Sequence, residues 1–540
     1  MSFTSLKFIA FLIFTVLLYY ILPKKHQWKL LLLASYIFYF FAGKWYLPYI
    51  IATTLSSYFI ARLISKNLQN EKVYLNENKA TIDKEGKKAY KAQEKKKRFN
   101  ILILGLVFNF GILGVLKYTG FTISNINSII HIFDSDTSLI IPKLILPLGI
   151  SFYTFQTMGY LIDVYREKTV AEENVFRLAL FVSFFPQLIQ GPISRHSDLA
   201  SQLYCGHDAK WVNISSGALR IAWGYFKKLI IADTVMVAIT TVIGNPQKYA
   251  GGYVFFLILA YSAQIYADFT GGIDITIGIA EALGIRLKEN FDHPFASKCT
   301  KEYWNRWHIT MGSWFTDYIF YPLSICKPMQ KLSKFSRAKF GNALGKRIPV
   351  YLATIFTWFL TGLWHGASWN FIVWGLLNCL VILVSQELTP LFNKFHKRFP
   401  RVSSSYAWTL FCRTRTFLLM GAIRILDCYR DVPTTFRGLF SMFTNLASWA
   451  EMFSGGILKL GLNISDFALI AVAIAVVCIV SKFQKAEGIS LRHKISEKPI
   501  LTCICICALI IAIVIFGAYG LGFDSSGFIY TQFSFALVYS

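Results

Sequence analysis

Charged residues are scarce in this sequence, and none occurs between Tyr351 and Val384, where Lys, Arg, Asp and Glu are all absent. Only 16% of the 540 residues are charged and 55% are apolar, and the mean hydropathy is +0.47. This composition excludes a soluble protein of such length. Apolar runs long enough to cross a bilayer recur from end to end, which predicts an all-α polytopic membrane protein with about 10 to 13 spans.

Acidic residues are the scarcer charged class, with 29 Asp and Glu against 55 Lys and Arg, a formal net charge of +26. A basic chain can bind nucleic acid, but these cations lie mainly in the loops between apolar runs. Excess Lys and Arg mark cytoplasmic loops, so the charge predicts topology, and we expect no nucleic-acid partner. The segment 66–98 and the acid-free loop Lys327–Arg347 are then cytoplasmic, and the C-terminus lies outside.

Several familiar motifs are missing as well. The sequence has no Gly-x-Ser-x-Gly, Walker A or His-Glu-x-x-His motif, and no His and Cys grouping has zinc spacing, so we expect no bound metal or cofactor. No Ala-x-Ala-like site follows the first apolar run, Phe8–Leu22, which we interpret as a retained span rather than a signal peptide. Cys503, Cys505 and Cys507 alternate inside an apolar run and are interpreted as small core residues.

Composition divides the chain into three regions. Residues 1–65 form N-terminal spans, and residues 66–98 form a basic cytoplasmic loop that is either helical or disordered. Residues 99–540 form the remaining core, with an extracytoplasmic tail at about 521–540.

Two histidines are candidate functional residues. His365 lies inside the charge-free stretch, in Gly362-Leu-Trp-His-Gly-Ala-Ser-Trp369. An imidazole at membrane depth is costly unless it is paired or lines a wet cavity, which favours a functional role. His308 lies in the aromatic segment Tyr303–Thr310; taken alone, that segment fits an aromatic belt at the membrane interface at least as well.

Polar residues also interrupt two apolar runs. Gln264, Asp268, Thr270 and Asp274 occupy a run that should otherwise be a span, and the Gly-Gly pair between the last two favours a break or kink. Buried polar groups need partners, so this segment either faces a wet interior or forms a self-satisfied network between helices. In the other run, Gln-Gly-Pro at 190–192 predicts a re-entrant bend or a kinked helix.

Taken together, these segments resemble the membrane-bound O-acyltransferase superfamily, in the branch of the alginate O-acetylation membrane subunit, the peptidoglycan O-acetyltransferase and the teichoic-acid D-alanyl transfer protein. The matches run in order from about Ile141 to the C-terminus: Pro147–Gln156, Phe184–Pro192, Gln264–Asp274, Glu289–Phe291, Tyr303–Thr310, Trp364–Gly366 and Phe528–Phe533. Two departures are Asp268-Phe-Thr-Gly-Gly-Ile-Asp274, where many relatives have Asp-Phe-Ser-Gly-Tyr-Ser-Asp, and Ser324–Lys327, where Gly-Gly-Asn is usual.

The resemblance implies a ring of transmembrane helices around a central funnel or tunnel. It implies that His365 is catalytic and that His308 is the second histidine of the same funnel. The residues expected to line this tunnel or its polar pocket are Gln264, Asp268, Thr270, Asp274, Trp364, Asn305 and Gln187.

The implied activity is transfer of an acyl group, most simply acetyl, from a cytoplasmic acyl-CoA thioester across the cell membrane for O-acetylation of an extracytoplasmic polysaccharide. An imidazole can serve as general base or be acylated itself. Lys327, Lys331 and Lys334 would attract the anionic donor. Tyr530, in the tail motif Phe-x-Tyr-x-x-Phe, would carry the acyl group to a partner, a secreted or membrane-anchored esterase-like acyltransferase.

Other functions remain open at this point. A D-alanyl group could pass from a carrier-protein thioester to teichoic acid. A transporter or flippase of lipid-linked glycan would also need a polar path through the membrane, and a scaffold of an export complex would need neither histidine. The tail could equally be an aromatic belt at the end of a span.

Overall fold

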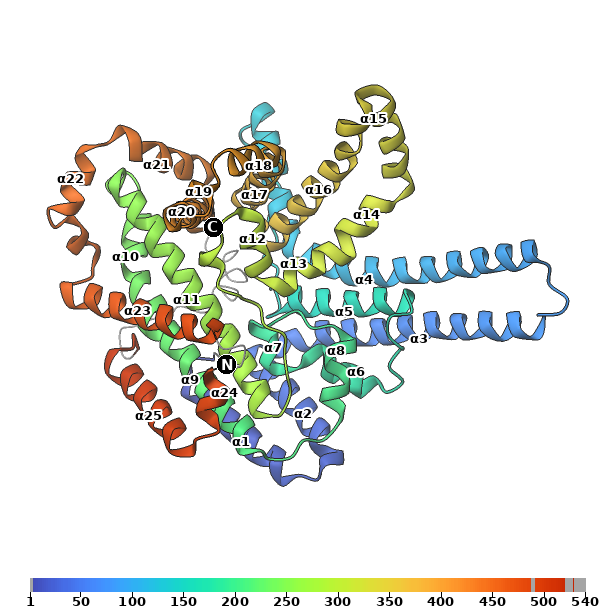
Figure 1. Cartoon of the computed structure of the whole chain (residues 1–540). Coiled ribbons are helices and arrows are strands. Elements are labelled where there is room, and N and C mark those ends of the chain that lie inside the picture. The colour runs from blue at the N-terminus through green and yellow to red at the C-terminus, as the bar shows by residue number, and fades with distance from the viewer. Residues whose placement is uncertain (1–2, 487–490, 520–527, 529–540) are drawn as a thin grey trace. The chain divides into compact units, whose positions relative to one another are not determined.

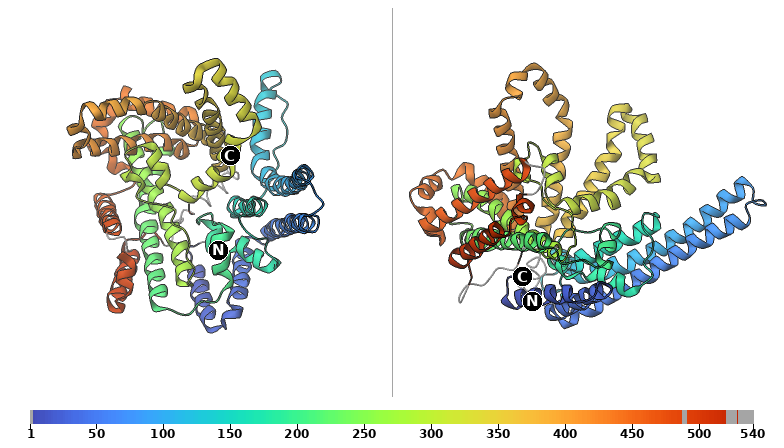
Figure 2. Two further views of the ribbon diagram at one scale, coloured as in Figure 1. Left: turned by 45° about the vertical axis from the view of Figure 1, so that its right-hand side comes forward. Right: turned by 60° about the horizontal axis from the view of Figure 1, so that its bottom comes forward.

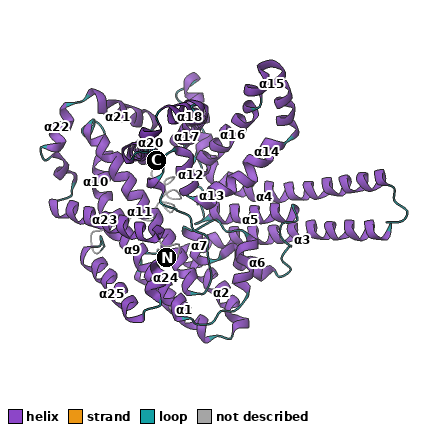
Figure 3. Ribbon diagram, viewed as in Figure 1, coloured by secondary structure: helices purple, strands orange, loops and turns teal. Residues whose placement is uncertain are grey.

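The computed structural model describes residues 3–486, 491–519 and 528. Within these ranges the chain is helical and has no β-strand, apart from one isolated antiparallel bridge between Phe291 and Trp307 (Figure 3). The described residues form two compact units: unit 1 comprises 3–217 and 279–287, and unit 2 comprises 218–278, 288–486, 491–519 and 528. The all-α fold expected from the sequence is confirmed.

Unit 1 holds the N-terminal helices (Figure 1). It also contains the first residues of α9 and the last turn of α11. Its elements are α1 (Leu6–Ile21), α2 (Lys24–Ala42), η1 (Lys44–Tyr46), α3 (Leu47–Glu77), α4 (Lys84–Phe133), α5 (Ile150–Tyr165), α6 (Val175–Ser183), α7 (Phe185–Ile189) and α8 (His196–Tyr204).

Unit 2 holds the rest of the described chain. Its elements are α9 (Trp211–Phe226), η2 (Lys227–Ala232), α10 (Asp233–Gly244), α11 (Gly252–Ala282), η3 (Pro294–Ala296), α12 (Thr300–Arg306), α13 (Ile309–Phe315), η4 (Thr316–Phe320), α14 (Tyr321–Ile325), α15 (Lys327–Gly345), α16 (Arg347–His365), α17 (Trp369–Glu387), α18 (Thr389–Arg398), α19 (Pro400–Ser403), α20 (Tyr406–Tyr429), α21 (Val432–Thr444), α22 (Ala447–Phe453), η5 (Gly456–Leu460), α23 (Ile464–Ala486), α24 (Leu491–Ser496) and α25 (Pro499–Phe516). Both η2 and η4 are π-helical.

Seven helices of the described chain are long and apolar enough to cross a membrane: α3, α4, α11, α16, α17, α23 and α25. The protein is therefore a multi-pass membrane protein. Seven is fewer than the 10 to 13 spans expected from hydropathy. The run 303–325, for example, is not one helix: α12 ends at Arg306 and the chain turns at His308, after which α13, η4 and α14 follow one another without a break to Ile325.

The basic segment 66–98 is helical on both sides of a short turn, so the helical alternative is the one that the structure shows. The long hairpin of α3 and α4 is drawn in blue in Figure 2. Asp83 caps α4 by accepting a hydrogen bond from the Gly86 N–H at 2.9 Å, and the Arg98 guanidinium pairs with Glu71 across the hairpin. This pair joins the two helices, whereas most other polar residues of the segment are exposed.

The α16–α17 hairpin places His365 at the end of a helix that packs unusually closely on its neighbour. A Cβ on Gly362 would lie 2.4 Å from the Phe371 carbonyl oxygen, and one on Gly375 would lie 2.5 Å from that of Trp358. Only glycine permits this backbone approach, a common device where membrane helices pack. The close packing holds the end of α16 and its histidine against α17.

Two expectations about secondary structure and one about burial are wrong. The segment Lys327–Arg347 is not a loop but mostly the helix α15, kinked at Gly341, where φ is 75°. The Gly-Gly pair at 271–272 does not break α11, which continues for 31 residues. Gly271 allows close packing instead, since a Cβ there would lie 2.8 Å from the Gly224 carbonyl oxygen of α9.

The third concerns the cysteines of α25, which are not core residues. Cys503 and Cys507 are exposed and Cys505 is half-buried. Only 6% of the apolar window of this helix is buried inside the protein. A helix that is apolar on every side and exposed suits contact with lipid, so apolar surroundings in the sequence did not indicate a protein core.

Candidate active site

His365 is the last residue of α16 and is held among aromatic rings. Its imidazole centroid lies 4.9 Å from the Trp364 ring and 4.7 Å from the Trp374 ring, both in edge-to-face geometry. The Phe371 ring is nearly parallel to it at 6.4 Å. A Cβ on the next residue, Gly366, would lie 2.1 Å from the Phe371 ring. This packing fixes the direction of a half-buried imidazole.

His308 is fully buried and has a left-handed backbone, with φ at 51°. Such a conformation is uncommon outside glycine and persists where the surroundings enforce it. Here the segment around Asn290 does so: the Ile309 N–H donates to the Asn290 carbonyl at 3.0 Å, and the Asp292 N–H donates to the Arg306 carbonyl at 3.0 Å. The histidine therefore begins α13 from a backbone that is pinned on both sides.

The Asn290 side chain orients this histidine. Its Oδ1 accepts hydrogen bonds from the Thr310 N–H at 3.0 Å and the Thr310 hydroxyl at 2.9 Å, and it lies 3.3 Å from His308 Nδ1. Because Oδ1 is an acceptor, this contact assigns the proton to Nδ1 and leaves Nε2 as the basic nitrogen. Sequence analysis quoted Asn290 as part of a matching segment but gave it no role.

The structure brings the two histidines to one indole ring. The Trp364 ring contacts His365 and also lies 6.0 Å from the His308 ring, edge to face. Phe269 of α11 packs on the His308 imidazole, with the two ring centroids 4.9 Å apart. The start of α13, the end of α16 and the middle of α11 thus meet here in unit 2.

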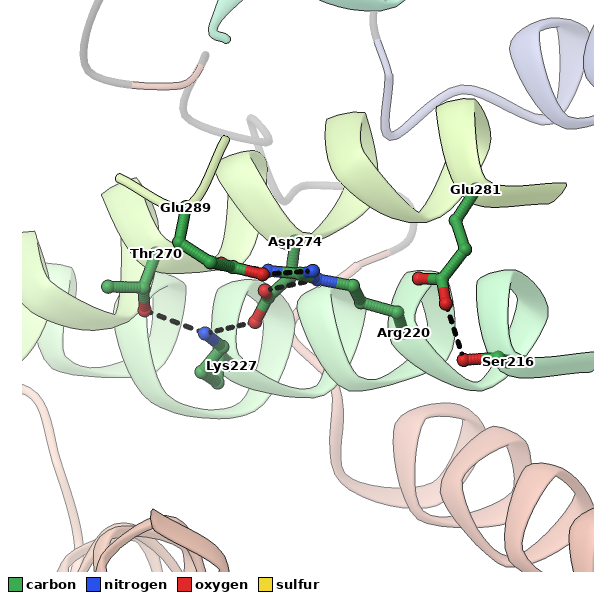
Figure 4. A network of polar contacts seen from close by, with 7 residues as sticks. All are labelled: Ser216, Arg220, Lys227, Thr270, Asp274, Glu281 and Glu289. Atoms are coloured by element: carbon green, nitrogen blue, oxygen red, sulfur yellow. Dashed lines mark hydrogen bonds and ion pairs between the residues drawn. The ribbon is translucent and has the colours of Figure 1, made fainter. Parts of the chain in front are cut away.

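Asp274 and Thr270 of α11 contact cationic side chains of the neighbouring helices (Figure 4). Asp274 accepts from Arg220 at 2.8 Å and from Lys227 at 2.7 Å, and Lys227 also donates to Thr270 at 2.7 Å. Arg220 makes a bidentate pair with Glu289 at 2.7 and 2.6 Å. The self-satisfied network between helices is the alternative that the structure shows at these residues.

A second ion cluster lies about two turns earlier on α11, at Asp268. Lys228 of η2 pairs with Asp268 at 2.6 Å and with Asp233 at 2.8 Å, and all three side chains are buried. The expectation that the cations lie in loops is therefore wrong for Arg220, Lys227 and Lys228. Sequence analysis missed these three cations. It singled out the carboxylates because they are charges inside an apolar run, and the same rule applies to the cations in the apolar run 217–243.

A cavity of about 760 Å³ borders the first network. Thr270 and Asp274 line it, together with apolar side chains of α23 and α25, but neither histidine does. Gln264 is buried elsewhere on α11, and its side-chain oxygen has no hydrogen-bond partner within the described part of the chain. The polar face of α11 is thus shared between an ion network and a cavity.

The remaining predicted residues lie in several places. Gln187 belongs to unit 1, where it donates to the Ser194 hydroxyl at 2.6 Å and closes the non-helical turn after α7. Asn305 is exposed on α12. Lys327, Lys331 and Lys334 are exposed on α15, and their i, i+4, i+7 spacing puts them on one face. Tyr530 lies outside the described residues.

Comparison with known proteins identifies the family. Residues 173–429 match the model of the membrane-bound O-acyltransferase family, MBOAT. The chain is 32% identical over 428 residues to the probable alginate O-acetylase AlgI of Pseudomonas aeruginosa, an alignment covering 79% of this chain and 72% of that protein. This chain belongs to the membrane-bound O-acyltransferase family. It is also 31% identical over 430 residues to the peptidoglycan O-acetyltransferase of Helicobacter pylori (73% and 72% covered) and 28% identical over 272 residues to the teichoic acid D-alanyltransferase of Bacillus subtilis (48% and 63% covered).

The protein is thus an MBOAT acyltransferase, as the resemblance implied. The matched range contains His308 and His365, both ion clusters of α11 and the helices that hold them. The His308 and His365 imidazoles both pack against the Trp364 indole. An imidazole in such surroundings, which largely exclude water, is chemically able to remove a proton from a nucleophile.

From the ion network around Asp274 we predict how two substitutions change the stability of this acyltransferase. Replacing Asp274 with asparagine should lower the free energy of unfolding by about 3 kcal/mol, because it removes the carboxylate shared by the buried Arg220 and Lys227. The matched control is Glu289→Gln, whose side chain is 60% exposed and whose loss should cost below about 1 kcal/mol. Thermal unfolding in detergent measures both, and equal losses would contradict the prediction.

Proposed function

We propose that this acyltransferase moves an acetyl group from a cytoplasmic acyl-CoA thioester across the cell membrane, for O-acetylation of an extracytoplasmic polysaccharide. The observation that carries the proposal is the convergence of His365 and His308 on Trp364. The acceptor class is supported by relatives named for O-acetylation of alginate and peptidoglycan, which match more of the chain than the D-alanyltransferase does.

His365 would act on the attacking hydroxyl. The imidazole nitrogen takes the hydroxyl proton, the oxygen attacks the thioester carbonyl carbon, and the carbonyl electron pair moves onto its oxygen. When that pair returns, the carbon–sulfur bond breaks and the thiolate of coenzyme A leaves, taking up a proton. A base held in position contributes about 10²–10⁴-fold to such a step.

The tail supplies a route to the outside. Tyr530 would accept the acetyl group first, and a secreted or membrane-anchored esterase-like acyltransferase would pass it from there to the polysaccharide. Support comes from two described residues that precede Tyr530: the Ala518 N–H donates to the Leu229 carbonyl at 3.0 Å, and the Phe528 ring lies 4.9 Å from Lys228 Nζ. Both contacts are with η2, and Asp268, which pairs with Lys228, adjoins Phe269 at the His308 ring.

The face of α15 that bears Lys327, Lys331 and Lys334 would capture the donor, because coenzyme A carries several negative charges. No acidic residue occurs in this helix. In the same unit, α18 offers a matched set of exposed cations for comparison, Lys394, Lys397 and Arg398.

The donor assignment predicts both an activity and its dependence on salt. Purified enzyme in detergent should hydrolyse acetyl-CoA slowly. Changing Lys327, Lys331 and Lys334 to glutamine should raise the apparent KM for acetyl-CoA several-fold and flatten its salt dependence, since exposed charges are screened beyond about 8 Å at physiological ionic strength. The α18 triple variant should leave the KM within about two-fold, because its charges lie outside the proposed capture face.

Kinetics at two salt concentrations measure this. Absence of acetyl-CoA hydrolysis, with hydrolysis of a D-alanyl carrier-protein thioester instead, would overturn the acetyl assignment. An unchanged KM in the α15 variant would show that the helix anchors topology alone.

A further inference from the structure

Arg424 is a buried cation beside the histidine site that sequence analysis did not single out. It lies on α20, and 5% of the residue is exposed. Its Nη2 donates to the Tyr303 hydroxyl at 2.5 Å, and its guanidinium carbon lies 4.1 Å from the Trp307 ring centroid. The Tyr303 and Trp307 rings stack at 5.7 Å, and Trp307 directly precedes His308 in the chain.

Arg424 differs from the other buried cations of unit 2 in its partners. Arg220, Lys227 and Lys228 each face a carboxylate at 2.6–2.8 Å. Across the described residues, Arg424 forms no ion pair, and its hydrogen bond to Tyr303 is the one that it makes. The nearby Asp427 accepts instead from the Tyr261 hydroxyl at 2.7 Å.

This arrangement leaves a permanent charge with no carboxylate at salt-bridge distance among the described residues, although the buried Asp427 is near enough to attract it. A guanidinium cannot lose its proton to relieve the cost of burial, and in the described chain its one side-chain hydrogen bond goes to the neutral Tyr303 hydroxyl. The Trp307 face and the Tyr303 oxygen offset part of that cost. Buried cations in membrane proteins mark substrate and ion sites by default, so an anionic group is expected opposite the guanidinium during turnover.

The turn of α20 that carries Arg424 also packs against residues that contact or adjoin the two histidines. Its neighbours Ile423 and Leu426 form a buried cluster with Trp374, whose ring lies 4.7 Å from that of His365. On its other side, the guanidinium covers Trp307, whose successor is His308. One turn of α20 therefore contacts the segments that carry the two imidazoles.

We propose that Arg424 is the anion-binding subsite of the reaction centre and stabilises the oxyanion of the acyl-transfer intermediate. The inference rests on the proposed acyl transfer at His365. When a hydroxyl attacks the thioester, one electron pair of the carbonyl moves onto its oxygen while the proton goes to the imidazole, so negative charge develops on one oxygen. A preorganised cation in a site that excludes water stabilises that charge more than it stabilises the neutral thioester.

The test compares three variants in acetyl-CoA hydrolysis by the full-length enzyme in detergent. Arg424→Met should lower kcat by about 10²–10³-fold, the effect of losing one oxyanion donor, with little change in KM. Arg424→Lys should recover at least about ten-fold of that loss, because the charge remains. Tyr303→Phe removes the hydrogen-bond acceptor but leaves the guanidinium, so its loss should stay within about ten-fold.

A second readout separates oxyanion binding from packing. A trifluoromethyl ketone analogue of acetyl-CoA mimics the tetrahedral oxyanion when hydrated, and its affinity should fall in Arg424→Met and Arg424→Lys in step with kcat, whereas coenzyme A affinity should hold. Wild-type kcat in Arg424→Met would overturn the inference, as would parallel loss of analogue and coenzyme A affinity in Arg424→Lys. Full activity in His365→Ala would overturn the proposed function instead, and this inference with it.

Discussion

Replacing His365 with alanine or glutamine should lower labelled-acetyl transfer by about 10²–10⁴-fold, the contribution of a positioned general base, while the protein still inserts into the membrane. The side chain is half-buried at the end of α16 and contacts three aromatic rings. Glutamine keeps a polar side chain of similar length but cannot take up a proton near neutral pH. The loss should therefore appear in kcat for both variants.

Transfer should be measured in membranes at matched enzyme levels, with the thermal midpoint in detergent confirming folding. A suitable control is His396→Ala, because His396 is an exposed histidine of α18. Near wild-type transfer in either His365 variant would remove this residue from the chemistry. Loss of transfer only together with a lower thermal midpoint would assign it a structural role.

Replacing Tyr530 with phenylalanine should abolish transfer to the final acceptor while insertion and thioester hydrolysis persist. The substitution deletes one hydroxyl, which is the proposed nucleophile. A phenol attacks a thioester readily once a base removes its proton, and the phenolate of the resulting aryl ester is a good leaving group in a second transfer. The C–S bond breaks in the first step, and the tyrosine oxygen is released in the second.

Intact-mass spectrometry of wild-type enzyme incubated with acetyl-CoA should show one labile acetyl group that maps to Tyr530 and is absent from the phenylalanine variant. Tyr519→Phe is the matched control, since Tyr519 is an exposed tyrosine shortly after α25 and outside the motif. Full acceptor acetylation by Tyr530→Phe would rule out the relay and leave His365 to act on the acceptor directly.

Much of the site follows from the cost of polar groups in an apolar chain. That rule selected His365 and the carboxylates of α11 from their surroundings in the sequence, and the family resemblance added His308; the structure places each of them inside unit 2. The same rule, applied only to carboxylates and histidines, passed over Arg220, Lys227 and Lys228. Arg424 was harder to find, because its significance depends on which acidic residues lie near it in space.

Hydropathy was less reliable about helices. It treated each apolar run as one span, but a run can also be interrupted by a turn whose backbone is satisfied by tertiary contacts. The segment before His308 shows this: its left-handed backbone exists because the chain around Asn290 pairs with it. The ring of helices around a tunnel stays a prediction of the family resemblance.

The sequence alone determined the class of protein, the all-α fold and the family, and it named the two candidate histidines, because these depend on composition, periodicity and motifs local to short segments. Only the tertiary structure decided that the histidines share Trp364, that α11 is unbroken and packs closely on Gly224, that its carboxylates are neutralised by α9 and η2, and that Arg424 forms no salt bridge in the described chain. Such facts depend on distances between residues far apart in the chain, since a buried charge is stabilised by whatever lies within a few ångströms of it and not by its neighbours in sequence.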